Sequence, residues 1–380
     1  MSYADRFDNS YEARLKRQMK VLRWQKVHLD PVLLSSLGIL AAIGCLILYS
    51  ASNENIALIR LQVIHFFFAF VGLIIIAQVP PSRLEQASPW LFSGTVILLT
   101  GVLLVGHVSQ GARRWLGIGA LQIQPSEIMK VAMPMMLAWF LNQRKLPVSI
   151  PDFIICLFII TVPCVLIIKQ PDLGTAILIF CSGLFVVLFS GINWKYIASL
   201  IGAALASSPL LWHHLHEYQK QRILTMLSPE NDPLGSGYNI IQSKIAVGSG
   251  GFLGKGYLHG TQSHLAFLPT HTTDFIFAVS AEEFGFIGSI LLLMLFLCVF
   301  ARCLYISQQS QSTYTRLLAG SLSCTFILNV LINMAMVIGI LPVVGVPLPL
   351  ISYGGSSILT AFVYFGIIMS IHTHRKLWSS

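Results

Sequence analysis

Three carboxylates lie at the start of a long apolar segment, where ionised groups are unexpected. The stretch LPTHTTDFIFAVSAEEFG (268–285) holds Asp274, Glu282 and Glu283, yet only 15 of the 380 residues are Asp or Glu. Charged side chains inside a membrane are costly, so they face protein, a water-filled cavity or a reacting group. A carboxylate at the end of such a segment is suited to take a proton from a hydroxyl nucleophile, which makes Asp274 a candidate general base.

Each of these acids also has a structural interpretation. Asp274 follows Thr272 and Thr273 at the expected start of a helix, where unsatisfied N–H groups and the helix dipole stabilise an acidic side chain. Glu282 is two helical turns deeper, about 12 Å along an ideal helix. We interpret Glu282 and Glu283 as structural partners or as the wall of a polar cavity, with direct chemistry as the alternative.

A second charged pair opens an apolar segment further upstream. In QPSEIMK (124–130), Pro125 is typical of a helix start, and Glu127 and Lys130 are three positions apart on one helix face. One interpretation is an ion pair whose members neutralise each other at a polar helix end. The other is a fixed charge pair that lines a cavity in the outer leaflet, and the two interpretations are compatible.

Cations and hydroxyls accompany the acids in neighbouring loops. GARRWLGIG (111–119) supplies Arg113 and Arg114, a pair suited to hold a phosphate, and Trp115, which suits a membrane interface. YQKQRI and SGYNIIQSKIAVGSGGFLGKG add further cations. GVPLPLISYGGSS adds the hydroxyls of Ser352 and Tyr353 on irregular backbone, which a membrane tolerates where that backbone lines a cavity.

The glycine-rich stretch does not encode a nucleotide site. A G-x-x-x-x-G-K-[ST] match ending at Gly254–Lys255 would need a glycine in place of Ser249 and a hydroxyl residue in place of Gly256. HHLHE (213–217) fits no standard zinc spacing either. We therefore expect no nucleotide and find no metal ligand set, although a divalent cation could assist a reaction.

The composition places these residues in a membrane protein. Hydrophobic residues make up 55% of the chain and charged residues 10%, against roughly 25% charged in soluble domains. We expect an all-α polytopic membrane protein with about ten transmembrane helices, because crossing a bilayer takes about 20 apolar residues. The expected spans are 31–51, 58–79, 89–107, 125–142, 152–169, 173–191, 194–213, 274–306, 315–340 and 352–373.

The distribution of basic residues predicts how the spans are oriented. Of the 24 Lys and Arg residues, 15 fall in the N-terminal segment, in alternate loops or in the C-terminal tail. Cytoplasmic loops are enriched in these residues, so both termini are predicted in the cytoplasm. Orientation in a membrane, rather than binding of nucleic acid, thus accounts for the net charge of +9.

This orientation defines the expected organisation of the chain. Residues 1–30 form a basic cytoplasmic segment, residues 31–373 a single membrane domain, and residues 374–380 a cytoplasmic tail. Within the membrane domain, residues from about 214 to 273 form a large extracytoplasmic loop between spans 7 and 8.

The predicted outer face combines a carboxylate, cations and hydroxyls at the membrane surface. A reaction there cannot use ATP, so its substrate must arrive activated and membrane-soluble, and polyprenyl-diphosphate sugars satisfy both conditions. Cations would stabilise the diphosphate leaving group while the carboxylate deprotonates an attacking sugar hydroxyl. The alternatives are a flippase for a lipid-linked cell-wall precursor, which predicts polar residues in the inner half too, and a non-enzymatic scaffold, which leaves the outer cluster unexplained.

At these same residues the sequence resembles a known family. GARRWL, QPSEIMK, QPDLGTA, YQKQRI, TDFIFAVSAEEFG and GVPLPLISYGGSS, in this order, are similar to motifs of the SEDS proteins (shape, elongation, division and sporulation). The resemblance covers nearly the whole chain beyond residue 30. QPSEI and GVPLPLISYGG are more similar to RodA, the elongation member, than to the division member FtsW.

The resemblance implies a ten-span peptidoglycan glycosyltransferase that polymerises lipid II outside the bacterial inner membrane. Asp274 matches the family's essential aspartate, and Trp115 its outer-loop tryptophan. Glu127 and Lys130 match the family's intramembrane charged pair. Other positions in matching motifs are candidates for the cavity or for substrate binding: Arg113, Arg114, Arg222, Lys244, Glu282, Ser352 and Tyr353.

The resemblance also implies partners and shows one departure. Its substrates are lipid II and undecaprenyl-diphosphate-linked glycan, and its partners are a class B penicillin-binding protein, which supplies the transpeptidase, and other proteins of the elongation complex. The family usually has His directly before the Thr-Asp pair, whereas this chain has Thr272, with His271 one place earlier. A proton relay through that histidine is therefore in doubt here.

Overall fold

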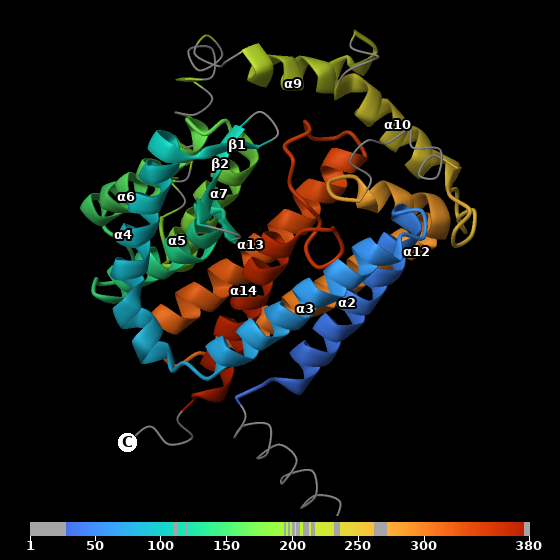
Figure 1. The fold of residues 1–380 in the computed structure, drawn as a ribbon. Coiled ribbons are helices and arrows are strands. Elements are labelled where there is room, and N and C mark those ends of the chain that lie inside the picture. The colour runs from blue at the N-terminus through green and yellow to red at the C-terminus, as the bar shows by residue number, and fades with distance from the viewer. Residues whose placement is uncertain are drawn as a thin grey trace, which may run out of the picture.

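The computed structural model describes residues 28–109, 112–118, 121–193, 195–196, 198–199, 202, 206–207, 213, 217–231, 236–261 and 272–375, and is nearly all-helical (Figure 1). Within the described residues, the first six helices are α2 (Pro31–Ala51), α3 (Ile56–Ala77), α4 (Pro81–Val105), α5 (Pro125–Asn142), α6 (Ile150–Ile168) and α7 (Leu173–Phe189). After them come α9 (Glu217–Leu227), the short 3₁₀ helix η1 (Pro229–Asn231), α10 (Ser236–Ser249), α12 (Ile276–Gln308), α13 (Thr313–Val337) and α14 (Gly355–Thr373).

A small antiparallel sheet lies between α4 and α5. Its strands are β1 (His107–Ser109), β2 (Ala112–Ile118) and β3 (Leu121–Ile123), in the order β1-β2-β3. We did not predict this sheet, because β1 and β3 have three residues each and carry little periodic signal.

Among the described residues, seven helices are long and apolar enough to cross a membrane, namely α2, α3, α4, α6, α12, α13 and α14, and α7 is a shorter apolar helix. The observed helices overlap nine of the ten predicted spans, and α2 and α5 begin and end at the predicted residues. The predicted span at 194–213 lies mostly outside the described residues. The helical polytopic membrane architecture is thus confirmed, while the number of crossings and their orientation stay predictions.

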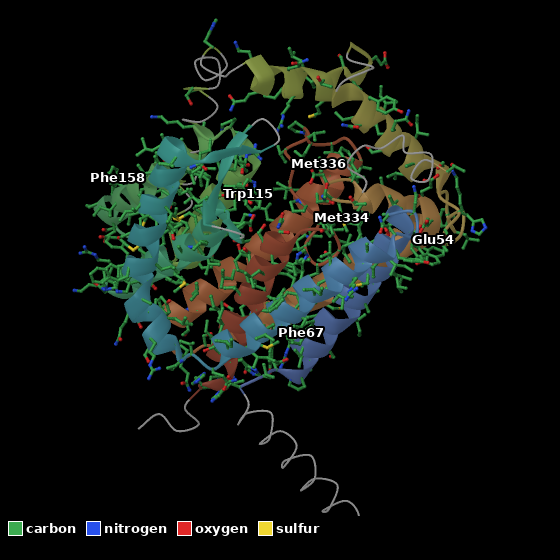
Figure 2. All side chains as sticks on the ribbon, viewed as in Figure 1. Glu54, Phe67, Trp115, Phe158, Met334 and Met336 are labelled. Carbon is green, nitrogen blue, oxygen red and sulfur yellow. The ribbon has the colours of Figure 1, made fainter. Side chains whose placement is uncertain are left out.

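Helix α13 forms the centre of the bundle. Its most apolar window is 72% buried, against 22% for α3 and α4, and it packs against α12, α7 and α5. The peripheral helices expose large apolar side chains on their outer faces, such as Phe67 on α3 and Phe158 on α6 (Figure 2). Such an outer face is typical of a helix bundle that is surrounded by lipid.

The two ends of the described chain lie on the same side of the bundle. His28 Nδ1 lies 3.2 Å from Thr373 Oγ1, and the His28 ring stacks on that of His374 with 3.9 Å between centroids. Helices α9 and α10 lie at the opposite end (Figure 1). This arrangement agrees with an even number of crossings.

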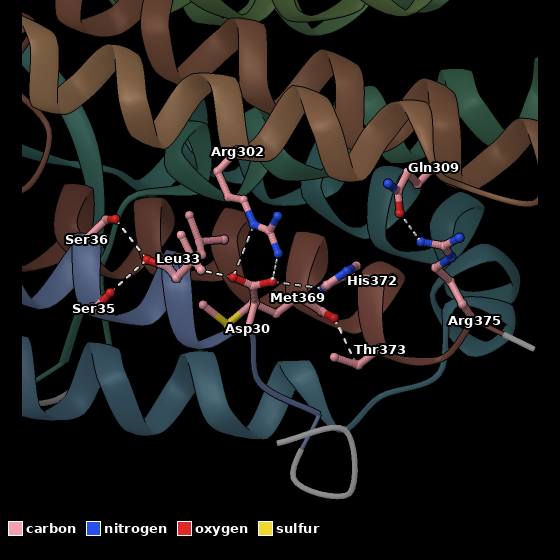
Figure 3. A network of polar contacts seen from close by, with 11 residues as sticks. Asp30, Leu33, Ser35, Ser36, Arg302, Gln309, Met369, His372, Thr373 and Arg375 are labelled. Atoms are coloured by element: carbon pink, nitrogen blue, oxygen red, sulfur yellow. Dashed lines mark hydrogen bonds and ion pairs between the residues drawn. The ribbon is translucent and has the colours of Figure 1, made fainter. Parts of the chain in front are cut away.

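At the end that carries the termini, one carboxylate joins three helices (Figure 3). Asp30 accepts hydrogen bonds from Arg302 Nη2 of α12 at 2.5 Å and from the N–H of Leu33 at 2.8 Å, and His372 Nδ1 of α14 lies 3.0 Å away. Burial opposes ionisation of Asp30, but the hydrogen bonds from His372, Arg302 and Leu33 outweigh it and hold the pKa of this carboxyl well below its usual range. We call Asp30, Leu33, Arg302 and His372 the Asp30 cluster.

Helix α12 is interrupted near its other end. Gly285 has a φ of 66° and a ψ of −161°, which are not helical. The glycine-rich loop after α10 satisfies the backbone groups freed by this break through four hydrogen bonds, from Phe286 to Gly251, Ile287 to Phe252, Lys255 to Glu282 and Gly256 to Glu283. A Cβ on Gly250 or Gly254 would lie 2.1 Å from a carbonyl oxygen of α12, so the loop needs glycine where the two backbones touch. The glycine-rich loop therefore supplies the hydrogen-bond partners that α12 lacks at its break.

Candidate active site

Asp274 lies in the turn just before α12, and its side chain is half-buried. The N-cap position of α12 is Phe275, and no side chain caps this helix, so Asp274 does not have the capping role considered above. Within the described part of the chain, the Asp274 carboxylate forms no hydrogen bond or ion pair, and Gly345 lies beside it, with a Cβ position 3.6 Å from Oδ2. The described residues therefore position this carboxylate through its backbone and form no bond to its oxygens.

The loop before α14 holds that backbone in place. Ser352 Oγ donates to the carbonyl of Thr273 at 2.6 Å and accepts the N–H of Leu348 at 2.8 Å, and the N–H of Tyr353 donates to the Thr272 carbonyl at 3.0 Å. Ser352 is only 1% exposed. In this structure the Ser352 hydroxyl fixes the segment that leads to the carboxylate.

Asn333, which sequence reasoning missed, also holds the backbone of this segment. Asn333 of α13 is fully buried, and its Nδ2 donates to the carbonyls of Asp274 at 2.8 Å and Val346 at 2.7 Å. An amide near the end of the most buried span was an available signal, because a buried polar group must find a partner. Asn333 thus ties α13 to both loops that form the site.

Two arginines from distant segments act on the Asp274 carboxylate. Burial raises the pKa of Asp274, and the positive charges of Arg222 on α9 and Arg114 on β2 partly oppose this rise. A carboxyl whose pKa is raised is a stronger base once ionised, which suits proton abstraction. The electrostatic influence of two of the predicted cations therefore reaches the carboxylate.

Arg114 is itself anchored to another loop. Its Nη2 donates to the carbonyl of Pro171 at 2.6 Å, and its Nη1 lies 3.8 Å from Asp172 Oδ2. Asp172 also caps α7, so the acid of the QPDLGTA motif holds an arginine of the GARRWL motif. This anchoring fixes the direction of Arg114 and leaves Arg222, on the partly exposed face of α9, as the less constrained cation.

The other predicted residues lie on β2, on α10 and in the loop before α14. Trp115 is on β2 and partly exposed (Figure 2), and Arg113 is on the same strand, although its side chain lies outside what the structure describes. Lys244 on α10 lies against Gly339, whose Cβ position is 2.1 Å from Lys244 Cε. Tyr353 faces His65 of α3, with 5.9 Å between ring centroids.

The pair in α5 is a buried ion pair. Lys130 Nζ lies 2.6 Å from Glu127 Oε1, and both residues are buried. Glu127 Oε2 and the hydroxyl of Tyr364 on α14 are also buried, with no hydrogen-bond partner among the described residues. This geometry agrees with the interpretation that Glu127 and Lys130 neutralise each other, and it places the pair in the core of the bundle.

The two deeper acids of the 268–285 stretch bind protein groups. Glu282 is 0% exposed, and its Oε1 lies 2.7 Å from Lys255 Nζ and 2.9 Å from the N–H of Thr261. Glu283 accepts a hydrogen bond from Ser50 Oγ at the end of α2. Both acids thus fasten the glycine-rich loop and α2 to α12, which agrees with the structural interpretation.

Metal-binding geometry is not found in the described ranges. No group of three or more His, Cys, Asp or Glu residues is placed to hold an ion there. Residues 214–216 of the HHLHE stretch lie outside the described residues.

A bundle of long apolar helices with an apolar outer face defines a polytopic membrane protein. A family model described as "Cell cycle protein", FtsW/RodA/SpoVE, matches residues 29–377. The chain belongs to this family.

Relatives with assigned names cover almost the same length. The peptidoglycan glycosyltransferase MrdB of Escherichia coli strain K12 is 48% identical over 357 residues, which cover 94% of this chain and 96% of that protein. MrdB of Helicobacter pylori strain 26695 is 37% identical over 335 residues, or 86% of each chain.

Two solved structures share the fold. A chain from a study of a peptidoglycan synthase complex that coordinates polymerization and crosslinking has a TM-score of 0.80 and 29% identity, covering 91% of this chain and 99% of that one. The rod shape determining protein RodA of Thermus thermophilus has a TM-score of 0.70 and 25% identity, covering 91% and 98%.

Proposed function

We propose that this protein is a peptidoglycan glycosyltransferase that polymerises lipid II into glycan strands during cell elongation. The observation that carries the proposal is a half-buried carboxylate at the end of a membrane bundle, without a hydrogen-bond or ion-pair partner in the described chain and under the electrostatic influence of two arginines. Membership of the FtsW/RodA/SpoVE family and the 48% identity to a named peptidoglycan glycosyltransferase support it.

The proposed reaction is an inverting transfer between two lipid-linked sugars. The 4-hydroxyl of the acceptor GlcNAc attacks the anomeric carbon of the terminal MurNAc on the growing chain. Asp274 takes the hydroxyl proton as the new C–O bond forms. The bond from the anomeric carbon to the diphosphate oxygen breaks, and undecaprenyl diphosphate leaves with that electron pair.

The cations at the site stabilise the leaving group. Negative charge grows on the diphosphate as its bond breaks, and fixed positive charges aimed at it lower the barrier. Arg222 is suited to this role because it comes from α9, across the end of the bundle, and acts on Asp274 through space. Lys244 and Arg113 are assigned to the same polar wall, and Trp115 to the membrane interface beside it.

The proposal includes the setting of the protein. The site faces the extracytoplasmic side of the bacterial inner membrane, both termini are cytoplasmic, and α9 and α10 belong to the large outer loop at 214–273. Residues 1–30 and 374–380 flank a single membrane domain. A class B penicillin-binding protein is the proposed partner, because the solved synthase complex whose chain shares this fold couples polymerization to crosslinking.

Reconstitution tests this function. The purified protein, with a cognate penicillin-binding protein whose own chemistry is blocked, is supplied with labelled lipid II, and glycan length is read on a gel. We expect polymer from the wild type and none from Asp274→Asn. Polymer from both proteins would remove Asp274 from the reaction.

The same assay separates the polymerase from a flippase. In liposomes, a flippase moves labelled lipid II across the bilayer without lengthening it. Absence of polymer with a folded protein and its partner present, together with transbilayer movement, would favour the flippase.

A further inference from the structure

Two adjacent apolar side chains are largely exposed in the glycine-rich loop, which comprises residues 249–257. Phe252 is 72% exposed and Leu253 is 80% exposed. The ring of Phe252 lies beside that of Phe286 on α12, which is also exposed, with 5.5 Å between the ring centroids. Contiguous exposed apolar side chains mark a surface that contacts a membrane or another protein.

This patch continues the outer face of α12. Further along the helix, the exposed apolar side chains have the spacing of a single helix face, at Ile287, Ile290, Leu291 and Met294. No charged residue occurs between Glu283 and Arg302, and the helix is long and apolar enough to cross a membrane. Phe252 and Leu253 therefore extend a face that is suited to contact lipid.

Two contacts give the level of the loop along the bundle. The Tyr257 hydroxyl donates to the carbonyl of Leu46 at 3.0 Å, and Leu46 precedes the end of α2 at Ala51 by about 7 Å of ideal helix. The N–H of Phe286, about 15 Å along α12 from its start, donates to the Gly251 carbonyl at 2.9 Å. Helix α9 lies further out (Figure 1). The loop is therefore alongside α2 and α12 rather than beyond their ends.

The polar groups of the loop suit burial in hydrocarbon. Backbone groups at membrane depth must be hydrogen-bonded within the protein, and the loop forms four backbone hydrogen bonds with α12 at its break. Lys255 is the only charged residue of the loop, and its Nζ lies 2.7 Å from Oε1 of the fully buried Glu282. Charged side chains inside membranes are usually paired in this way. The loop thus adds no unpaired charge to the apolar face.

We propose that the glycine-rich loop re-enters the membrane, where Phe252 and Leu253 insert among the acyl chains of the leaflet nearest α9. Tyr257 then lies at the interface, where an aromatic ring with a polar group is favoured. Acyl chains are the occupant that this surface fits, because it is continuous with the lipid-facing side of α12 and offers neither a free charge nor a polar side chain to a protein partner.

The insertion changes how the large outer loop is understood. Residues 214–273 were expected to be extracytoplasmic as a whole, whereas the proposal places 249–257 inside the membrane. The loop follows α10 directly, so its insertion also holds α10 and Lys244 at the membrane surface. This contact with lipid does not depend on the proposed reaction.

Photocrosslinking tests the insertion in the full-length protein. Phe252 is replaced by p-benzoylphenylalanine, and the protein is placed in liposomes of phosphatidylethanolamine and phosphatidylglycerol without lipid II. After irradiation, covalent adducts are identified by mass spectrometry. We expect phospholipid adducts at this position, as at Leu291 on the apolar face of α12. Leu227 on α9 is the matched control, because it is 69% exposed but lies further out, and it should give no phospholipid adduct.

Two outcomes of this experiment would overturn the insertion. One is phospholipid adducts at Leu291 but none at Phe252 or Leu253, which would place the loop in water. The other is adducts to a second copy of the chain, or to the cognate penicillin-binding protein when it is added, in place of phospholipid. That result would identify a protein interface. Because no lipid II is present, either outcome leaves the proposed function untouched.

A charge in the loop provides a second measurement. Leu253→Asp places a carboxylate in hydrocarbon, which is costly, so the loop should leave the membrane. Trypsin added on the α9 side of the liposomes should then cleave after Lys255. The wild type, Leu253→Met and the control Leu227→Asp should resist cleavage there. Equal resistance of Leu253→Asp would show that the loop lies outside the membrane.

Discussion

Two carboxylates lie near opposite ends of helix α12 and have contrasting surroundings. Asp30 is buried, and Asp274 is half-buried. At one end, Asp30 is fully used by Arg302, His372 and the N–H of Leu33, and its pKa is lowered. At the other end, Asp274 keeps its oxygens free of described partners, and burial raises its pKa. A carboxylate whose partners satisfy it serves stability, whereas one held only by its backbone retains the capacity to react.

The largest expected effect comes from removing the free carboxylate. Asp274→Asn keeps the shape of the side chain but cannot take a proton, and loss of a general base costs about 10²–10⁴ in rate. The apparent Tm should stay the same or rise, because burial disfavours the Asp274 charge more than Arg222 and Arg114 stabilise it. Gel-based polymerisation and scanning fluorimetry measure both quantities, and a large fall in Tm would erase the contrast with Asp30.

Substitution of Asp30 should lower stability while leaving activity intact. Asp30→Ala leaves Arg302 without its buried partner, and breaking such a pair costs about 3–5 kcal/mol. Thermal unfolding in detergent should show a large fall in Tm, with activity retained per folded molecule. Asp152→Ala is the control. Asp152 Oδ1 lies 3.4 Å from Nε of Arg144, whose side chain is 48% exposed, and exposed pairs contribute about 0–1 kcal/mol to stability.

The pair in α5 tests whether a buried ion pair can be replaced. Glu127→Gln or Lys130→Met alone leaves one buried charge unpaired, whereas the double variant leaves none. Each single variant should therefore unfold at a lower temperature than the double variant, with a coupling of about 0.5–3 kcal/mol. Equal stability of all three would mean that Tyr364 or water already compensates each charge.

A smaller effect is expected from the serine that positions Asp274. Ser352→Ala removes the hydrogen bond to the Thr273 carbonyl, which is worth about 0.5–1.5 kcal/mol, or roughly 2- to 13-fold in rate if it is expressed fully in kcat. We expect kcat to fall with little change in KM, because the hydroxyl is buried away from the substrate. Thr360→Ala, which loses only a bond within α14, should leave kcat unchanged.

The pH dependence of activity should move with the arginines. Asp274 must be ionised to act as a base, so activity rises with pH through its raised pKa. Arg222 lowers that pKa, and Arg222→Ala should therefore shift the acid limb of the kcat profile to higher pH. An acid limb that moves down or stays in place would show that another group limits the rate.

The same pKa shift has a consequence for stability with the opposite sign to that of Asp30. Because the folded pKa of Asp274 lies above the ordinary aspartate value of 3.8, its contribution to stability is fully present below pH 3.8 and is lost as the pH rises through the folded pKa. Asp30 contributes stability above its unfolded pKa and loses it only as the pH falls through its lowered folded pKa.

Local patterns in the sequence determined the spans and the main candidates for chemistry. Apolar runs and helix-start signals predicted nine helices close to where they lie, and a spacing of three positions predicted the contact between Glu127 and Lys130. The rarity of acids identified Asp274 before any contact was known. Such features depend on residues within one or two helical turns of each other, so a single sequence is enough to find them.

Only the tertiary structure shows which polar groups have hydrogen-bond or ion-pair partners. Asp30 meets Arg302 across 272 positions of sequence, Ser352 reaches Thr273 across 79, and His65 lies against Gly355 on another helix. The break at Gly285 and its repair by the glycine-rich loop are equally non-local. A side chain becomes structural or reactive according to the partners that packing brings to it, and packing joins segments that share no sequence pattern.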